Sequence, residues 1–234
     1  NQNPEITCTA NSVTLEIIKN LFLIKTTDTF QNFPDHKSLD NILDNVYNLY
    51  YRDWPQRIII DRGPVMLSGN PGNFELMQKH FKNGFKCVVL LRDLMEVFAS
   101  YMKWYTENPN SFVNKLGKTD EEKLLALMNN ESAIVKEIKS IQNAYNYSNI
   151  CHFIKYNDLV SNPQKTFRDL YKFLDEPYYP HYFENLKQIK INDIEYDDTV
   201  VGKNMHTIRP TVKKETNNYI VPKNIKERYG HIKI

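Results

Sequence analysis

Two side chains of this sequence have the types and spacing needed to hold an anion. Arg92 directly follows the apolar run 85–91, and Ser100 stands eight residues later. A guanidinium binds two phosphate oxygens at once because its donors are planar and rigid. If the intervening residues are helical, this separation spans about two turns, so the long arginine arm and the hydroxyl can reach one group. The spacing therefore predicts a phosphate site.

The elements that position these residues follow from the hydrophobic pattern. Short apolar runs alternate with stretches in which apolar residues recur every three or four positions, which is typical of parallel strands connected by helices. The expected strands are 6–9, 57–60, 85–91 and 150–154, and the expected helices are 13–23, 39–51, 73–81, 94–105 and 120–145. Parallel sheets bind ligands at the carboxyl ends of their strands, where Arg92 lies. The sequence thus predicts an α/β fold with a parallel sheet covered on both faces.

Composition limits the classes of function. The chain has 234 residues, of which 41% are hydrophobic and 25% charged, and we expect one domain over residues 1–234. A net charge of only +2 argues against a nucleic-acid-binding protein. No apolar run is long enough to cross a bilayer, and the polar beginning does not resemble a signal peptide, so we expect a cytoplasmic protein. Cys8, Cys87 and Cys151 lie in apolar runs and are expected to be reduced.

The segment from Arg92 to Ser100 reads Arg-Asp-Leu-Met-Glu-Val-Phe-Ala-Ser. It resembles the 3′-phosphate-binding motif of sulfotransferases, which use the donor 3′-phosphoadenosine 5′-phosphosulfate (PAPS). In that family, an arginine at a strand end and a serine at the same spacing bind the phosphate that distinguishes PAPS from ATP. The resemblance implies that Arg92 and Ser100 bind PAPS. The alternative is a solvated Arg92–Asp93 pair and an ordinary helical serine.

A second segment, 153–174, resembles the strand, the proline-containing turn and the amphipathic helix of the same family. In the family, the tyrosine at the position of Tyr156 lies near the adenine, where a phenol can stack on the base. The alternative is a strand-end tyrosine that covers the core. Together the matches imply the three-layer α/β/α fold of the P-loop-NTPase type, with a central parallel sheet, that sulfotransferases share.

A third segment places Asp61 and Arg62 between the run 58–60 and a Gly-Pro turn. Tyrosylprotein and small bacterial-type sulfotransferases carry a lysine at the place of Arg62, and that lysine points at the transferred sulfuryl group. Arginine keeps the positive charge but changes the shape and the hydrogen-bonding pattern. The alternative is an ordinary charged turn on the surface.

The basic segment 202–211 loosely resembles the loop that closes over the cofactor in this family. The resemblance makes Lys203, His206 and Arg209 candidate cofactor contacts. The lysines that follow, Lys213 and Lys214, are more typical of a solvated tail.

The resemblance implies in-line transfer of a sulfuryl group from PAPS to a hydroxyl or amine, which leaves adenosine 3′,5′-bisphosphate. Such a transfer requires cations at the sulfuryl oxygens and a base at the acceptor, but no metal. No His or Cys spacing typical of metal ligands occurs in the sequence. The candidates for the base are Glu16, Asp61 and His206. The acceptor, whether a small molecule, a carbohydrate or a peptide, does not follow from the sequence.

One feature of the family is missing from this sequence, namely the Gly-x-Pro-Arg-Ser-Gly-Thr loop that holds the 5′-phosphosulfate. The first residues resemble the family segment just downstream of that loop. We therefore expect the loop and its strand upstream of residue 1, and no transfer activity without them.

Two other functions stay open. A P-loop kinase-like phosphotransferase would require a Walker-type lysine motif, which the sequence lacks, and a non-catalytic binding module would use the same fold.

Overall fold

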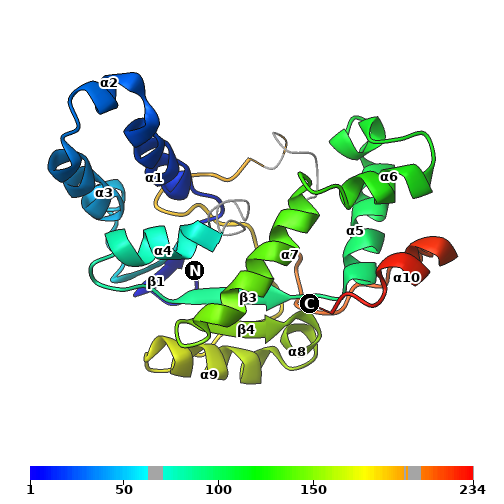
Figure 1. Cartoon of the computed structure of the whole chain (residues 1–234). Helices are drawn as coiled ribbons and strands as arrows, with labels where there is room; N and C mark the ends of the chain where they lie inside the picture. Colours follow the sequence, from blue (N-terminus) through cyan, green and yellow to red (C-terminus); the bar gives the residue numbers. More distant parts are fainter. Residues whose placement is uncertain (63–70, 198, 200–206, 234) are drawn as a thin grey trace. The chain divides into compact units, whose positions relative to one another are not determined.

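The computed structural model describes residues 1–62, 71–197, 199 and 207–233. These residues form two compact units (Figure 1). Unit 1 comprises Asn1–Phe85 and Lys190–Tyr196, and unit 2 comprises Lys86–Ile189 and Asp197–Ile234. Each unit contains a pair of parallel strands together with helices, which confirms the predicted α/β class and the parallel strand pairing. A single domain over residues 1–234 stays a prediction.

Unit 1 contains the parallel strands β1 (Ile6–Cys8) and β2 (Ile58–Ile60), paired from Ile6 with Ile58 to Cys8 with Ile60. Helices α1 (Thr14–Leu23) and α3 (His36–Tyr50) pack against each other through buried apolar side chains. The buried residues of this core are Ile18, Phe30, Leu39, Leu43 and Val46. The remaining elements are η1 (Ile24–Thr26), α2 (Asp28–Asn32) and α4 (Pro71–His80).

Unit 2 contains the parallel strands β3 (Cys87–Leu91) and β4 (Cys151–Lys155), paired from Cys87 with Cys151 to Leu91 with Lys155. The chain turns directly from β3 into α5 (Leu94–Glu107) and from β4 into α8 (Tyr156–Ser161). Helix α9 (Pro163–Leu174) follows, with proline in its first turn, where a missing backbone N–H costs no helical hydrogen bond. The other elements are η3 (Phe112–Lys115), α6 (Asp120–Leu127), α7 (Ala133–Ala144), η4 (Tyr145–Tyr147) and α10 (Lys223–Tyr229).

Helix α5 is the central element of the core of unit 2. Asp93 caps its first turn by accepting hydrogen bonds from the backbone N–H groups of Met95 and Glu96. Its buried side chains, among them Phe98 and Met102, pack against residues of α6, α7 and α10. The other buried residues of this core are Leu94, Ala99, Leu124, Leu127, Ile134, Ile138, Val221 and Ile225.

The prediction of one helix over 120–145 is wrong. The structure has two helices, α6 and α7, because local side-chain caps interrupt the helical hydrogen bonds. Thr119 and Glu122 form a reciprocal capping box at the start of α6, and Ser132 accepts a hydrogen bond from the N–H of Val135 to start α7. Serine competes in this way with a continuous helix because its hydroxyl bonds the backbone locally.

Candidate functional site

In unit 2, the carboxyl ends of β3 and β4 bring two predicted site residues together. Leu91 and Lys155 are the last paired residues of the two strands, so Arg92 and Tyr156 emerge side by side. The guanidinium carbon of Arg92 lies 4.2 Å from the centre of the Tyr156 ring. Stacking over an aromatic face attracts the cation and restrains the orientation of the guanidinium plane.

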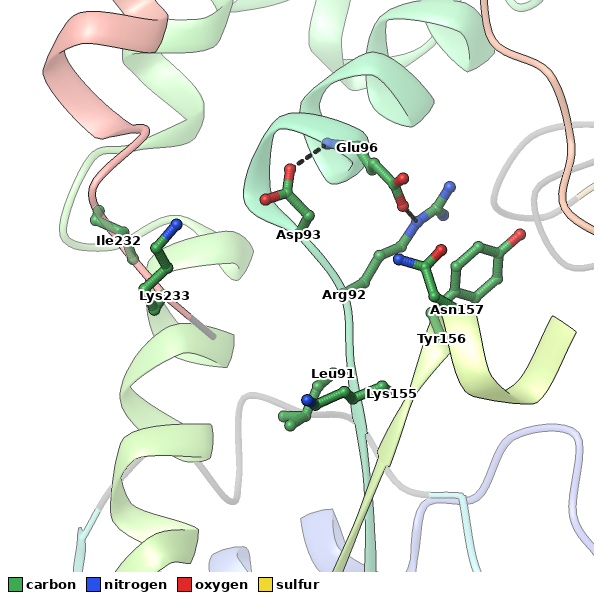
Figure 2. Close-up of a pocket in the computed structure, with 9 residues that line it drawn as sticks. All are labelled: Leu91, Arg92, Asp93, Glu96, Lys155, Tyr156, Asn157, Ile232 and Lys233. Carbon is green, nitrogen blue, oxygen red and sulfur yellow. Dashed lines mark hydrogen bonds and ion pairs between the residues drawn. The ribbon is translucent and has the colours of Figure 1, made fainter. Parts of the chain in front are cut away.

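The edge of the Arg92 guanidinium has a second contact, with the carboxylate of Glu96 one turn along α5 (Figure 2). Arg92 Nε donates to Glu96 Oε2 over 3.5 Å, and Lys214 Nζ donates to Glu96 Oε1 over 2.8 Å. The hydrogen bond from Lys214, followed by that from Arg92, holds the pKa of Glu96 below its ordinary value. Glu96 is therefore an ionised carboxylate between two cations. Neither described contact of Arg92 uses its two terminal nitrogens.

A cavity of about 170 Å³ lies at this edge of the sheet. It is lined by Leu91, Arg92, Asp93, Glu96, Lys155, Tyr156, Asn157, Ile232 and Lys233, all drawn in Figure 2. Its cations are Arg92, Lys155 and Lys233, whereas the Asp93 carboxylate is engaged as the cap of α5. Pockets that bury a drug-sized ligand have volumes of roughly 300–1,000 Å³. This cavity is therefore suited to a phosphate-sized anion rather than to a whole nucleotide.

Ser100 lies in α5, about two turns after Arg92, as the spacing predicted. Its side chain is half-buried. It is not among the residues that line the cavity. Helical spacing places it on the same face of α5 as Glu96 and Lys103, four residues before and three after. The structure thus puts Ser100 on the correct helix but does not bring it to the cavity wall.

In unit 1, Arg62 follows β2 and contacts the turn after β1. Its backbone N–H donates to Thr9 Oγ1 over 2.8 Å, and its Nη1 donates to the carbonyl of Ala10 over 2.7 Å. Arg62 is exposed. The Gly-Pro turn predicted after it, residues 63 and 64, lies outside the described residues.

The Asp61 carboxylate is embedded among hydroxyl groups. It accepts a hydrogen bond from Thr9 Oγ1 over 3.2 Å and another from the hydroxyl of Thr14. Burial, and then the nearby Asp61 charge, raises the pKa of Tyr47. Asp61 thus connects the β1–α1 turn to β2 in the described structure, and its lone pairs are largely used in doing so.

Sequence reasoning did not single out this hydroxyl network. Tyr51 donates to Ser12 over 3.0 Å, and the Ser12 and Thr14 hydroxyls are 2.9 Å apart. Ser12 and Thr14 are buried although they are polar. In the sequence, this network is indicated only by the recurrence of Thr and Ser through 7–14. The hydrophobic pattern of the same residues predicts a strand and the start of a helix.

The structure says less about the remaining residues predicted to belong to the site. Glu16 lies in the first turn of α1 and is exposed. Arg209 forms an ion pair with Glu215, with 3.0 Å between Nε and Oε1. Lys203 and His206 lie outside the described residues.

In the described part of the chain, no three His, Cys, Asp or Glu side chains are arranged to hold a metal ion. None of the described helices has the length and apolar character needed to cross a membrane.

The comparisons with known proteins identify the family. The profile of the sulfotransferase family matches residues 30–180, which is more than half of the chain. This chain belongs to the sulfotransferase family. The matched region of this sulfotransferase includes the strand-end residues Asp61, Arg62, Arg92 and Tyr156 and the helical Ser100. Glu16, Lys203, His206 and Arg209 lie outside that region.

A solved structure similar to this sulfotransferase is described as the sulfotransferase domain from the curacin biosynthetic pathway. The two chains are 18% identical, the similarity covers 93% of this chain and 79% of the other, and the TM-score is 0.49. The comparison with curated proteins finds no match.

Proposed function

We propose that this protein transfers a sulfuryl group from PAPS to a hydroxyl or amine, and that Arg92 binds the 3′-phosphate of the donor. Membership of the sulfotransferase family supports sulfuryl transfer. The observation that carries the phosphate assignment is the restrained guanidinium of Arg92, held on its face by Tyr156 and at its Nε by Glu96. A guanidinium fixed in this way presents its terminal nitrogens as a preorganised pair of donors.

The cavity supports the same assignment through its size and its charge. The phosphate-sized space is lined by three cations, Arg92, Lys155 and Lys233, and by two carboxylates, Asp93 and Glu96, so its lining carries a net positive charge that favours an anion over a neutral group. In this proposal Ser100 adds a hydroxyl donor when the anion is bound, which requires the phosphate to extend from the cavity toward α5. Tyr156 is proposed to lie at the adenine end of the donor.

The chemical step is an in-line displacement at sulfur. The acceptor oxygen or nitrogen forms a bond to sulfur while the bond between sulfur and the bridging phosphate oxygen breaks, and adenosine 3′,5′-bisphosphate leaves. The acceptor proton passes to a base, for which Glu16, Asp61 and His206 are the candidates; of these, Asp61 already accepts two hydroxyl hydrogen bonds. Arg62 is proposed as the cation that stabilises charge on the transferred group. The acceptor is proposed to be a small molecule, a carbohydrate or a peptide.

A matched set of nucleotides tests the phosphate assignment. Adenosine 3′,5′-bisphosphate should raise the melting temperature of the protein, whereas adenosine 5′-monophosphate, which lacks the 3′-phosphate, should raise it far less. ATP with Mg²⁺ is the third ligand. An equal or larger effect of ATP would favour a kinase-like phosphotransferase, and no effect of any nucleotide would favour a non-catalytic binding module.

The structure supplies a matched control for Arg92. Arg168 lies over the Tyr178 ring at 4.3 Å, a second arginine–tyrosine stack in unit 2 whose residues do not line the cavity. Arg92→Ala should weaken bisphosphate binding at least ~10-fold, because a charge-assisted phosphate contact is worth about 1.5–3 kcal/mol. Arg168→Ala should leave the affinity unchanged. Equal effects of the two substitutions would contradict the assignment.

A further inference from the structure

The carboxyl-terminal segment of unit 2 lies against the face of α5 that carries Ser100. We name residues 207–216 the strap. Its neighbouring residues Lys214 and Glu215 have opposite charges, and each meets an opposite charge on α5. Lys214 Nζ is 2.8 Å from Glu96 Oε1, and Glu215 Oε2 is 3.8 Å from Lys103 Nζ. Ser100 lies between these two contact points along the helix.

The backbone of the strap is also fixed by hydrogen bonds to residues 183–186. Leu186 N–H donates to the carbonyl of Pro210 over 2.9 Å, and Val212 N–H donates to the carbonyl of Phe183 over 2.8 Å. These backbone contacts accompany an antiparallel bridge between Glu184 and Thr211. The backbone of the strap is therefore anchored to 183–186, while its charged side chains reach across to α5. The ion pairs connect these side chains to the helix.

Glu96 is the residue that connects the strap to Arg92. One carboxylate oxygen accepts from Lys214 and the other from Arg92, and the side chain is 28% exposed. Lys214 also donates to Asn157 Oδ1 over 3.2 Å, next to Tyr156. The contact with Lys214 is the shorter and stronger one, because a charge-assisted hydrogen bond weakens as its length increases. Loss of the carboxylate would therefore remove one ion pair of the strap and one restraint on Arg92 together.

We infer that Glu96 is a positioning residue that latches the strap across α5 beside Arg92 and thereby couples strap docking to anion binding at Arg92. The inference rests on the proposed function, in which the anion is the 3′-phosphate. The latch has a distinctive electrostatic consequence. A carboxylate near the site repels an incoming phosphate, so its removal by itself would strengthen anion binding. If Glu96 acts mainly as a latch, its removal weakens binding instead.

The test measures strap docking and ligand affinity in the same variants. Glu96→Gln keeps the size of the side chain but removes its charge. Amide hydrogen exchange in 207–216, followed by mass spectrometry on the ligand-free protein, should become ~5-fold faster, as expected for the loss of a favourable ion pair. The dissociation constant for adenosine 3′,5′-bisphosphate should rise by a similar factor.

Asp169→Asn is the matched control. Asp169 pairs with Lys165 on the surface of α9 at 2.6 Å, so this change also removes one carboxylate from a lysine ion pair in unit 2. It should alter neither strap exchange nor affinity. A stronger bisphosphate affinity of Glu96→Gln than of the control would overturn the inference, because Glu96 would then act as a repelling charge rather than as a latch.

Lys214 completes the test through a double-mutant cycle. If Lys214 acts through Glu96, then Lys214→Gln and Glu96→Gln are not additive, and the double variant behaves like either single one. Lys214→Arg should keep the strap docked. Exchange of the two strap charges in K214E/E215K preserves the net charge but sets like charges against Glu96 and Lys103, so it should undock the strap most strongly. Additive effects, or a docked strap in that permuted variant, would refute the latch.

The inference and the proposed function fail in different ways. If the wild-type protein does not bind adenosine 3′,5′-bisphosphate, the proposed function is wrong, although the exchange measurements can still show a latch. If the wild type binds the bisphosphate and Glu96→Gln changes neither strap exchange nor affinity, the latch is wrong and the proposed function is unaffected.

Discussion

The guanidinium of Arg92 stacks on the ring of Tyr156, 4.2 Å from its centre, at the adjoining ends of β3 and β4. The two residues belong to different sequence motifs, and the parallel register of the strands brings them together. An aromatic face restrains the arginine without occupying its hydrogen-bond donors. Arg92 and Tyr156 both line the cavity at this edge of the sheet.

The stack predicts different outcomes for two substitutions of Tyr156. Tyr156→Phe retains the ring and should bind adenosine 3′,5′-bisphosphate nearly as well as the wild type. Tyr156→Ala should weaken binding ~2–5-fold, because a cation–π contact at a partly exposed site is worth about 0.5–1 kcal/mol. Isothermal titration calorimetry measures both. If Phe is as harmful as Ala, the phenolic hydroxyl rather than the ring carries the effect.

Removal of the side-chain cap of α5 should lower the free energy of unfolding of unit 2. Asp93→Ala deletes the acceptor for two backbone N–H groups, and loss of such a cap costs about 1 kcal/mol. Urea unfolding should show a lower midpoint with an unchanged slope. Asp93→Ser, which retains a capping oxygen, should recover most of the loss. Equal midpoints for Ala and the wild type would show that other contacts fix this end of the helix.

Asp61 is predicted to be a structural residue. Asp61→Ala removes the acceptor of the Thr9 hydroxyl, whereas the Thr14 hydroxyl is also 2.9 Å from that of Ser12 and can keep a partner there. A buried polar group left unpaired costs about 1–3 kcal/mol, so the free energy of unfolding should fall by about that amount. Glu16→Ala, on the exposed side of α1, should not change it. A normally stable Asp61→Ala protein that has lost only activity would instead support a role as the catalytic base.

Strap docking should depend on pH through Glu96. Its folded pKa lies below its ordinary value of 4.5, so the Lys214 contact is fully formed above that value and is lost as the pH falls through the folded pKa. The protection factors of 207–216, which correct for intrinsic exchange rates, should therefore decrease in acid. The part of that decrease due to Glu96 should be absent from Glu96→Gln, a variant that retains the ion pairs of Glu215 with Lys103 and Arg209. Identical acid profiles would contradict the assignment.

The parts predicted from the sequence are those that depend on local pattern. The strand ends at Arg92 and Tyr156 follow from apolar runs that stop at polar residues, and parallel strands place such ends at one edge. The prediction of one helix over 120–145 gave too little weight to the polar run 129–132, which ends in the capping residue Ser132 and after which the apolar spacing resumes at Ile134.

Contacts between distant segments could not be predicted. Lys214 reads as one lysine of a solvated tail, and its pairing with Glu96 depends on how 207–216 folds back onto α5. The hydroxyl network around Asp61 similarly depends on the pairing of β1 with β2, which brings Thr9 next to Asp61. Side-chain type limited what these residues can do, and tertiary packing determined what they contact.

The carboxyl-terminal chain of unit 2 completes the core rather than trailing from it. Val221 and Ile225 are buried in the same cluster as Phe98 and Leu124, and Tyr219 donates a hydrogen bond to Asp120 over 3.1 Å. A protein cleaved within 176–182 should therefore keep its two fragments together without a covalent link. Separately expressed fragments should reassemble on mixing, so this protein lends itself to fragment complementation, in which assembly of unit 2 is controlled by fragment concentration.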